Sequence, residues 1–329
     1  MEHVLHYADV LVLDHAYNAV VSALRFGATL TLDTSGKCAL QHATAGAGEL
    51  ASNATVAGLT SAYLTLRDDT FRQLLSLFLI TVSFGHVLYQ SVATFSYYFI
   101  YDQNQLHHPR FLPNQIELEK KVATKAMGPM AAITVPWFFF EVRGYSKLYD
   151  NVDEYGWGWL VFSAFFFLFF TDMMIYWVHR ALHHRLLYAP LHKVSSASIG
   201  VFPTPFASHA FNFMDGYLQS LAYHVFVYLF PLHKLLYLVM FLLVNMWTVI
   251  IHDGEYFTND PIINGAAHHT VHHEQFNYNY GQYFTLWDRI GGTYRAPEEA
   301  VFERKMMLKN MLETQAKSTL TKTKSGKEQ

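Results

Sequence analysis

Two groups of histidines in the second half of the chain have the spacing of metal ligands. The stretch from His268 to His273 reads His-His-Thr-Val-His-His, which places imidazoles at positions i, i+3 and i+4 of one helical face. Upstream, His179 and His183 are again four residues apart, and His184 follows directly. Adjacent imidazoles at this spacing would repel one another if they were protonated. Both groups therefore predict a bound metal ion rather than ordinary packing.

The composition of the chain narrows the kind of metal site. The sequence contains 19 histidines but a single cysteine, which excludes iron–sulfur sites and zinc sites built on several thiolates. Imidazole suits iron, copper, zinc or nickel. The formal net charge is −3, and basic and aromatic residues do not alternate as they do in proteins that follow a phosphate backbone. We therefore expect no nucleic acid partner.

Further side chains could complete or support the metal site. His209, in Ser-His-Ala-Phe, and His252, in Ile-His-Asp-Gly, read equally well as ligands and as packed side chains. Asp172 lies seven residues before His179, two turns along the same face, where its carboxylate could orient a ligating imidazole or pair with a cation. Asp288 could orient an imidazole of the last histidine group in the same way.

Long apolar segments must position these histidines. Hydrophobic residues make up 52% of the chain and charged residues 15%, which is unlike a soluble protein. Residues 74–100 contain no acidic or basic side chain and are long enough to cross a hydrocarbon core of about 30 Å. Residues 157–178 form a second long apolar run, in which Asp172 is the one charge. Residues 126–140 are shorter and contain two prolines, which indicates a kinked span or a re-entrant segment.

The last apolar region decides the predicted topology. Residues 217–251 are too long for one crossing and are broken near Pro231, so they read as a helical hairpin. The hairpin returns His252 to the side of His179, as a shared metal site requires. Lysine and arginine in the flanking loops favour the cytosol for that side.

Together these segments predict an all-α integral membrane protein with about four transmembrane helices in two hairpins and a cytosolic histidine-rich metal-binding cap. The predicted regions are an N-terminal part, a membrane-embedded domain and a polar tail that its composition predicts to be disordered, namely residues 1–70, 71–297 and 298–329.

Five segments around the histidines carry a family resemblance. They are His179-Arg-Ala-Leu-His183-His184, Pro203-Thr-Pro-Phe-Ala-Ser-His209, Ile251-His252-Asp-Gly, His269-Thr-Val-His272-His273, and the run from Asn277 to Gly292. They resemble the sterol C-5 desaturases of the membrane fatty acid hydroxylase superfamily, the fungal forms most of all. The resemblance extends from about residue 71 to about residue 297.

The resemblance implies a multi-pass enzyme of the endoplasmic reticulum membrane with two non-haem irons and histidine boxes that face the cytosol. It would introduce the 5,6 double bond into a Δ7-sterol taken from the membrane lipid, using dioxygen and electrons from NAD(P)H through cytochrome b5 and its reductase. The implied metal ligands are His179, His183 or His184, His192, His269, His272 and His273, with His209 and His252 as further candidates.

One box departs from the family pattern. The family's second box has the form His-x-x-His-His, whereas this chain continues from His192 to Ser195 and Ser196. Either residues 194–202 come from an error in the gene model, or the chain is real and its site is impaired. Three alternatives to the desaturase stay open, namely a sterol C-4 methyl oxidase, a lipid hydroxylase of the same superfamily, and a catalytically impaired sterol-binding relative.

Overall fold

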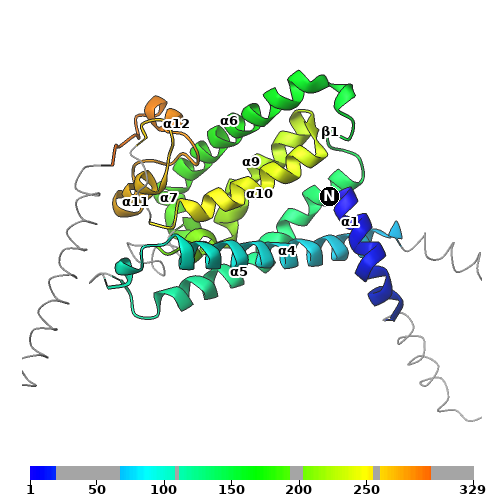
Figure 1. The fold of residues 1–329 in the computed structure, drawn as a ribbon, viewed down its shortest axis with the longest axis horizontal. Helices are drawn as coiled ribbons and strands as arrows, with labels where there is room; N and C mark the ends of the chain where they lie inside the picture. The colour runs from blue at the N-terminus through cyan, green and yellow to red at the C-terminus, as the bar shows by residue number, and fades with distance from the viewer. Residues whose placement is uncertain (20–66, 108–110, 193–202, 255–259, 298–329) are drawn as a thin grey trace, which may run out of the picture. The chain divides into compact units, whose positions relative to one another are not determined.

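The structure is a computed structural model that describes residues 1–19, 67–107, 111–192, 203–254 and 260–297. Most of the predicted N-terminal region, the polar tail and the segment with Ser195 and Ser196 lie outside the described residues. The described part is mainly helical, as predicted (Figure 1). Its two short strands, β1 (Leu148–Tyr149) and β2 (Leu232–His233), pair in parallel.

The chain divides into two compact units. Residues 1–83 and 135–145 form the first unit, and residues 84–134 and 146–329 form the second. Two long helices, α4 (Thr70–Phe99) and α5 (Gln115–Val142), contribute residues to both units. The segment 126–140, predicted as a kinked span or a re-entrant piece, belongs to α5, which continues through both of its prolines. The chain therefore does not turn back within this segment.

Buried ion pairs hold the first unit together. Helix α1 (Glu2–Ala8) continues into a π-helical turn, η1 (Asp9–Leu13). The guanidinium of Arg72, near the start of α4, lies 3.1 Å from the Asp9 carboxylate and also binds Asp14. All three side chains are buried, and a charge that leaves water in this way requires an opposite partner. The pairs fix the N-terminal helices against α4.

Three helices form the core of the second unit, and the second of them in the sequence runs antiparallel to the other two. In Figure 1, α6 (Gly156–Leu182), α9 (Phe213–Leu229) and α10 (Lys234–Ile250) lie side by side. Phe167, Phe226 and Val244 are fully or almost fully buried between them. Helices α9 and α10 are joined by a short turn at the predicted break, and the Trp159 indole donates to the Pro231 carbonyl at 3.1 Å. The predicted helical hairpin is therefore present.

Short elements lie at one end of this core. Three of them contain histidines, namely η5 (Tyr188–His192), η6 (Pro205–His209) and α11 (Ala266–Gln275), whereas α7 (Arg185–Leu187) and α12 (Leu286–Ile290) contain none. Elsewhere, short 3₁₀ turns are η3 (Gln103–His107) and η4 (Val152–Glu154).

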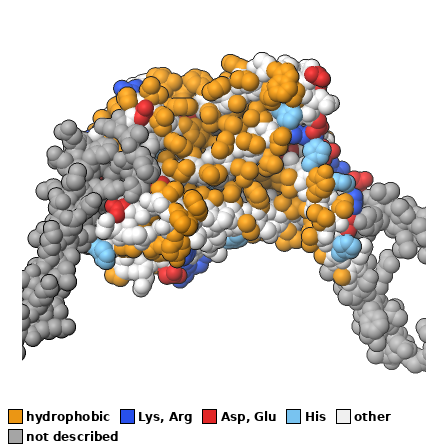
Figure 2. Space-filling model, in the orientation of Figure 1, with side chains coloured by type: hydrophobic (Ala, Val, Ile, Leu, Met, Phe, Trp, Pro, Cys, Tyr) orange, Lys and Arg blue, Asp and Glu red, His pale blue; other side chains and the backbone are white. Residues whose placement is uncertain are grey.

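Two of the described helices, α4 and α6, are long and apolar enough to cross a membrane. Helices α9 and α10 have 17 residues each, slightly fewer than the roughly 20 that a full crossing needs. Hydrophobic side chains cover much of the face shown in Figure 2. On α6, Trp157 and Phe165 are each 70% exposed, which suits contact with lipid.

The two faces of α6 can be tested with a matched pair of phenylalanines. Phe167 is 0% exposed and Phe165 is 70% exposed, although they lie two residues apart. We expect Phe167→Ala to lower the free energy of unfolding by about 3–5 kcal/mol, because it leaves a cavity in the core. Phe165→Ala should change it little. Chemical denaturation of the purified protein in detergent measures both effects, and equal losses would contradict this packing.

Candidate metal centre

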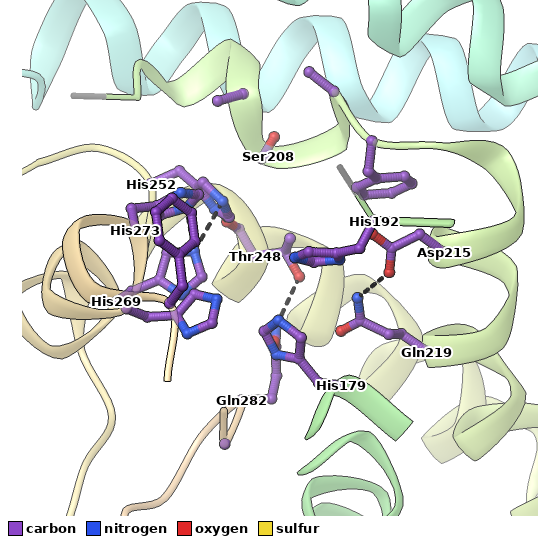
Figure 3. A pocket seen from close by; sticks show the side chains of 16 residues that line it. His179, His192, Ser208, Asp215, Gln219, Thr248, His252, His269, His273 and Gln282 are labelled. Atoms are coloured by element: carbon purple, nitrogen blue, oxygen red, sulfur yellow. Dashed lines mark hydrogen bonds and ion pairs between the residues drawn. The ribbon is translucent and has the colours of Figure 1, made fainter. Parts of the chain in front are cut away.

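Seven histidines from four parts of the second unit come together in two groups. The four-histidine group consists of His179, His183, His192 and His272, and the three-histidine group consists of His252, His269 and His273. In each group, one ring nitrogen from every member lies within 4.8 Å of the others. Figure 3 shows members of both groups around one cavity, with His179 and His192 of the first group and His252, His269 and His273 of the second labelled.

Helix α11 supplies histidines to both groups. His269 and His273, one turn apart, face the three-histidine group, and His272 faces the four-histidine group. The helix ends at Phe276, whose backbone is left-handed with φ 56°, and the chain then turns back towards His179. The i, i+3, i+4 pattern of the sequence therefore serves two neighbouring sites rather than one.

Backbone carbonyls fix the hydrogen positions on three of the imidazoles. Nδ1 of His179 lies 3.1 Å from the Tyr280 carbonyl, Nδ1 of His272 lies 2.7 Å from the Tyr278 carbonyl, and Nδ1 of His252 lies 2.7 Å from the Thr248 carbonyl. A carbonyl can only accept, so Nδ1 must carry the hydrogen. In a neutral ring Nε2 then presents its lone pair, which is the form that binds a metal ion.

A carboxylate fixes the hydrogen position on His192 in the same way. Oδ2 of Asp215 lies 2.7 Å from Nδ1 of His192, and Oδ1 of Asp215 accepts from the amide of Gln219 at 2.7 Å. Asp215 is 1% exposed. The sequence-based prediction missed this residue, and the signal that could have found it is an acidic side chain in the first turn of an otherwise apolar helix.

The three-histidine group has the geometry of an ion site. Nε2 of His269 lies 3.0 Å from Nε2 of His252 and 3.0 Å from Nε2 of His273. One hydrogen on His269 cannot satisfy both neighbours, whereas a cation between the rings would bind all three lone pairs. Nitrogens at about 2.1 Å from one ion are about 3 Å apart at right angles. In the four-histidine group, Nε2 of His183 is buried and has no hydrogen-bond partner among the described residues. Both groups therefore fit a bound metal.

Burial keeps these imidazoles neutral. It lowers the pKa of His183 to about 2, with additional repulsion from His272 and His192. It also lowers the pKa of His252 and of His272 to about 4, and those of His269 and His273 fall well below the usual value. An uncharged ring is the ligand form, so the site is ready for a cation at neutral pH.

Two of the candidate ligands lie outside both groups. His184 is exposed, and its Nδ1 accepts from the backbone of Leu186 at the start of α7. Nδ1 of His209 contacts the hydroxyl of Ser208 at 3.1 Å. The structure thus places His183, and not His184, in the four-histidine group, a choice that the sequence could not make. It places His252 in the three-histidine group and His209 in neither group.

The two predicted supporting carboxylates act through the backbone. Asp172 contacts no imidazole in the described part; its Oδ1 accepts from the backbone N–H groups of Gln282 and Tyr283 at 2.8 and 2.7 Å. Asp288 accepts from the N–H groups of Tyr280 and Gly281, both at 2.8 Å. Both carboxylates therefore hold the loop whose Tyr280 carbonyl orients His179, rather than binding a ligand directly.

A cavity of about 100 Å³ lies between the two groups. Six of the seven clustered histidines line it, and the rest of the wall includes small, aromatic and amide side chains, namely Ala207, Ala210, Phe211, Gln219 and Gln282. Drug-sized ligands occupy pockets of about 300–1,000 Å³. This cavity therefore admits only the reacting part of a large substrate.

Comparison with known proteins places this site in a family. Residues 164–293, which contain all seven clustered histidines, match the fatty acid hydroxylase family model. A Delta(7)-sterol 5(6)-desaturase of Schizosaccharomyces pombe is 45% identical over 100% of this chain and 97% of its own length.

Two further relatives agree. A Delta(7)-sterol 5(6)-desaturase of Gibberella zeae is 54% identical over 74% of this chain and 69% of its own length. The human lathosterol oxidase is 53% identical over 70% and 78%. No solved structure is significantly similar to the chain. The chain therefore belongs to the family of Delta(7)-sterol 5(6)-desaturases and lathosterol oxidases and carries a fatty acid hydroxylase domain.

Proposed function

We propose that this protein is a Δ7-sterol C-5(6) desaturase of ergosterol-type sterol biosynthesis, an oxidoreductase that introduces the 5,6 double bond. The observation that carries the proposal is the pair of buried, neutral imidazole groups that face one cavity. The 45% identity with a Delta(7)-sterol 5(6)-desaturase along the whole chain supports this choice.

The metal in this proposal is a pair of non-haem irons, one in each histidine group. An all-imidazole donor set suits iron, although it does not exclude copper or zinc by itself. The bound irons would supply the oxidant, by reducing dioxygen with two external electrons. Overall, the two hydrogens from C-5 and C-6, one dioxygen, two electrons and two protons give the alkene and two waters.

The protein's own contribution is orientation and exclusion of water. Tyr278, Tyr280 and Thr248 hold three rings through their carbonyls, and Asp215 holds the ring of His192. Such outer contacts keep ligand nitrogens directed at the ion. The small cavity between the two groups leaves room for one edge of a flat substrate, which brings a single pair of C–H bonds to the reacting centre.

The membrane arrangement follows from the same proposal. The catalytic domain spans residues 71–297, crosses the endoplasmic reticulum membrane four times in two pairs, and presents the histidines to the cytosol. There, cytochrome b5 and its reductase would deliver electrons from NAD(P)H. The apolar helices α4 and α6 and the exposed aromatic side chains of α6 support a membrane location.

The altered second box bears on activity. Ser195 and Ser196 lie outside the described residues, but the four-histidine and three-histidine groups form without them. A set of three or four imidazoles is enough to hold an iron ion. This favours a chain that binds metal as written over an impaired sterol-binding relative.

Sterol analysis tests the proposed reaction. In cells that lack this protein, we expect Δ7-sterols without the 5,6 double bond to accumulate, and expression of the chain should restore the double bond. Gas chromatography with mass spectrometry measures both. Accumulation of 4-methyl sterols would instead indicate a C-4 methyl oxidase, and accumulation of a non-hydroxylated lipid would indicate a hydroxylase.

Adjacent histidines provide a matched test of the metal ligands. His183→Ala removes a ring from the four-histidine group, so we expect it to lower iron content by at least one ion per chain and to abolish turnover. His184→Ala changes an exposed neighbour and should leave both near the wild-type level. Metal analysis of the purified proteins measures the iron content of both variants. Iron loss in the His184 variant alone would mean that His184, and not His183, binds the metal.

The low pKa values of the buried rings predict a stability loss in acid for the metal-free protein. The pKa of His252 and that of His272 fall from 6.5 to about 4 on folding. Above pH 6.5 the rings are neutral in both states, whereas between pH 6.5 and about 4 the unfolded chain binds more protons. Stability should therefore fall as the pH is lowered through this window. Thermal melting of the metal-depleted protein at a series of pH values measures this loss. A melting temperature that does not change with pH would contradict the low pKa values of these rings.

A further inference from the structure

Gln219 presents an unused acceptor to the cavity. Its Nε2 donates to Oδ1 of Asp215 at 2.7 Å, and an ionised carboxylate can only accept, so the amide cannot be flipped. Its Oε1 atom must then point away from Asp215. Both residues line the cavity, and no donor from the described part of the chain is bonded to this oxygen (Figure 3).

The other polar side chains of the cavity are more fully engaged. The Thr248 hydroxyl donates to the Val244 carbonyl and accepts from the amide of Gln282 at 3.0 Å. The Ser208 hydroxyl is bonded to Nδ1 of His209. Asp215 is shared between His192 and Gln219. Gln219 and Gln282 therefore each keep a side-chain oxygen to which no donor of the described part of the chain is bonded. Of the two, Gln219 is the one bonded to Asp215, the partner of His192.

The proposed substrate has one polar group, and it lies near the reacting bond. In a sterol, the hydroxyl on C-3 is separated from C-5 only by C-3 and C-4 themselves. Chemistry at C-5 and C-6 therefore brings that hydroxyl into the same small space as the oxidant. A hydroxyl taken from water into such a site needs a hydrogen-bond partner, since burial without one is costly.

We propose that the Oε1 atom of Gln219 accepts a hydrogen bond from the 3-hydroxyl group of the sterol. The inference rests on the proposed function, because it takes a Δ7-sterol as the ligand. Asp215 links this contact to the metal site: its carboxylate orients His192 on one side and the Gln219 amide on the other. The chain thereby sets the position of the sterol A ring relative to the four-histidine group.

Equilibrium binding to the purified, iron-loaded full-length protein in detergent tests this role without requiring turnover. The probes are a Δ7-sterol with a free 3β-hydroxyl and its 3-deoxy analogue. For wild type we expect the hydroxylated sterol to bind about tenfold more tightly, the usual effect of one well-placed hydrogen bond in a buried site. Gln219→Met should remove this preference by weakening the binding of the hydroxylated sterol alone, and the two proteins are compared at equal iron content.

Gln282→Met is the matched variant, because Gln282 is the other glutamine of the cavity. It should keep the preference for the hydroxyl, whatever its effect on overall affinity. The inference is overturned if Gln219→Met keeps the preference for the hydroxylated sterol or weakens the binding of both probes equally. It is also overturned if Gln282→Met removes the preference instead. Equal binding of the two probes to wild type also overturns it but leaves the desaturase proposal standing. If wild type binds neither sterol, both proposals fail.

Discussion

The site depends on one constraint: a buried histidine binds metal only if it is neutral and its free lone pair points inwards. Burial supplies the first condition by lowering the pKa of clustered rings such as those of His183 and His272. The second requires an acceptor behind each ring, and the fold provides carbonyls for His179, His252 and His272 and a carboxylate for His192. Loops and helix ends bring these acceptors into place, and Asp288 holds the loop that contains the Tyr280 carbonyl.

The supporting interactions lead back to the membrane helix α6. Asp172, which is 0% exposed in the middle of that helix, binds the backbone of the loop after α11. The same loop carries the Tyr280 carbonyl that orients His179 on α6. A single helix thus provides both a clustered histidine and the anchor of the loop that orients it. The helix and the loop hold each other in this way, which supports the orientation of the His179 ring.

Local features of the site were predictable from the sequence, whereas contacts between distant segments were not. Spacing at i, i+3 and i+4 identified His269, His272 and His273, and the break near Pro231 identified the hairpin. Periodicity describes the faces of one helix, however, and it cannot show that α11 divides its rings between two groups. For the same reason it could not choose between His183 and His184 or find Asp215, whose partner His192 lies 23 residues earlier.

The division of α11 between two groups would couple two bound ions. Ten residues are too few for a helix that is stable by itself in water. An ion bound in either group would hold α11 in place and so position the rings that the other group needs. Each ion would then raise the affinity for the other, by the same factor in both directions.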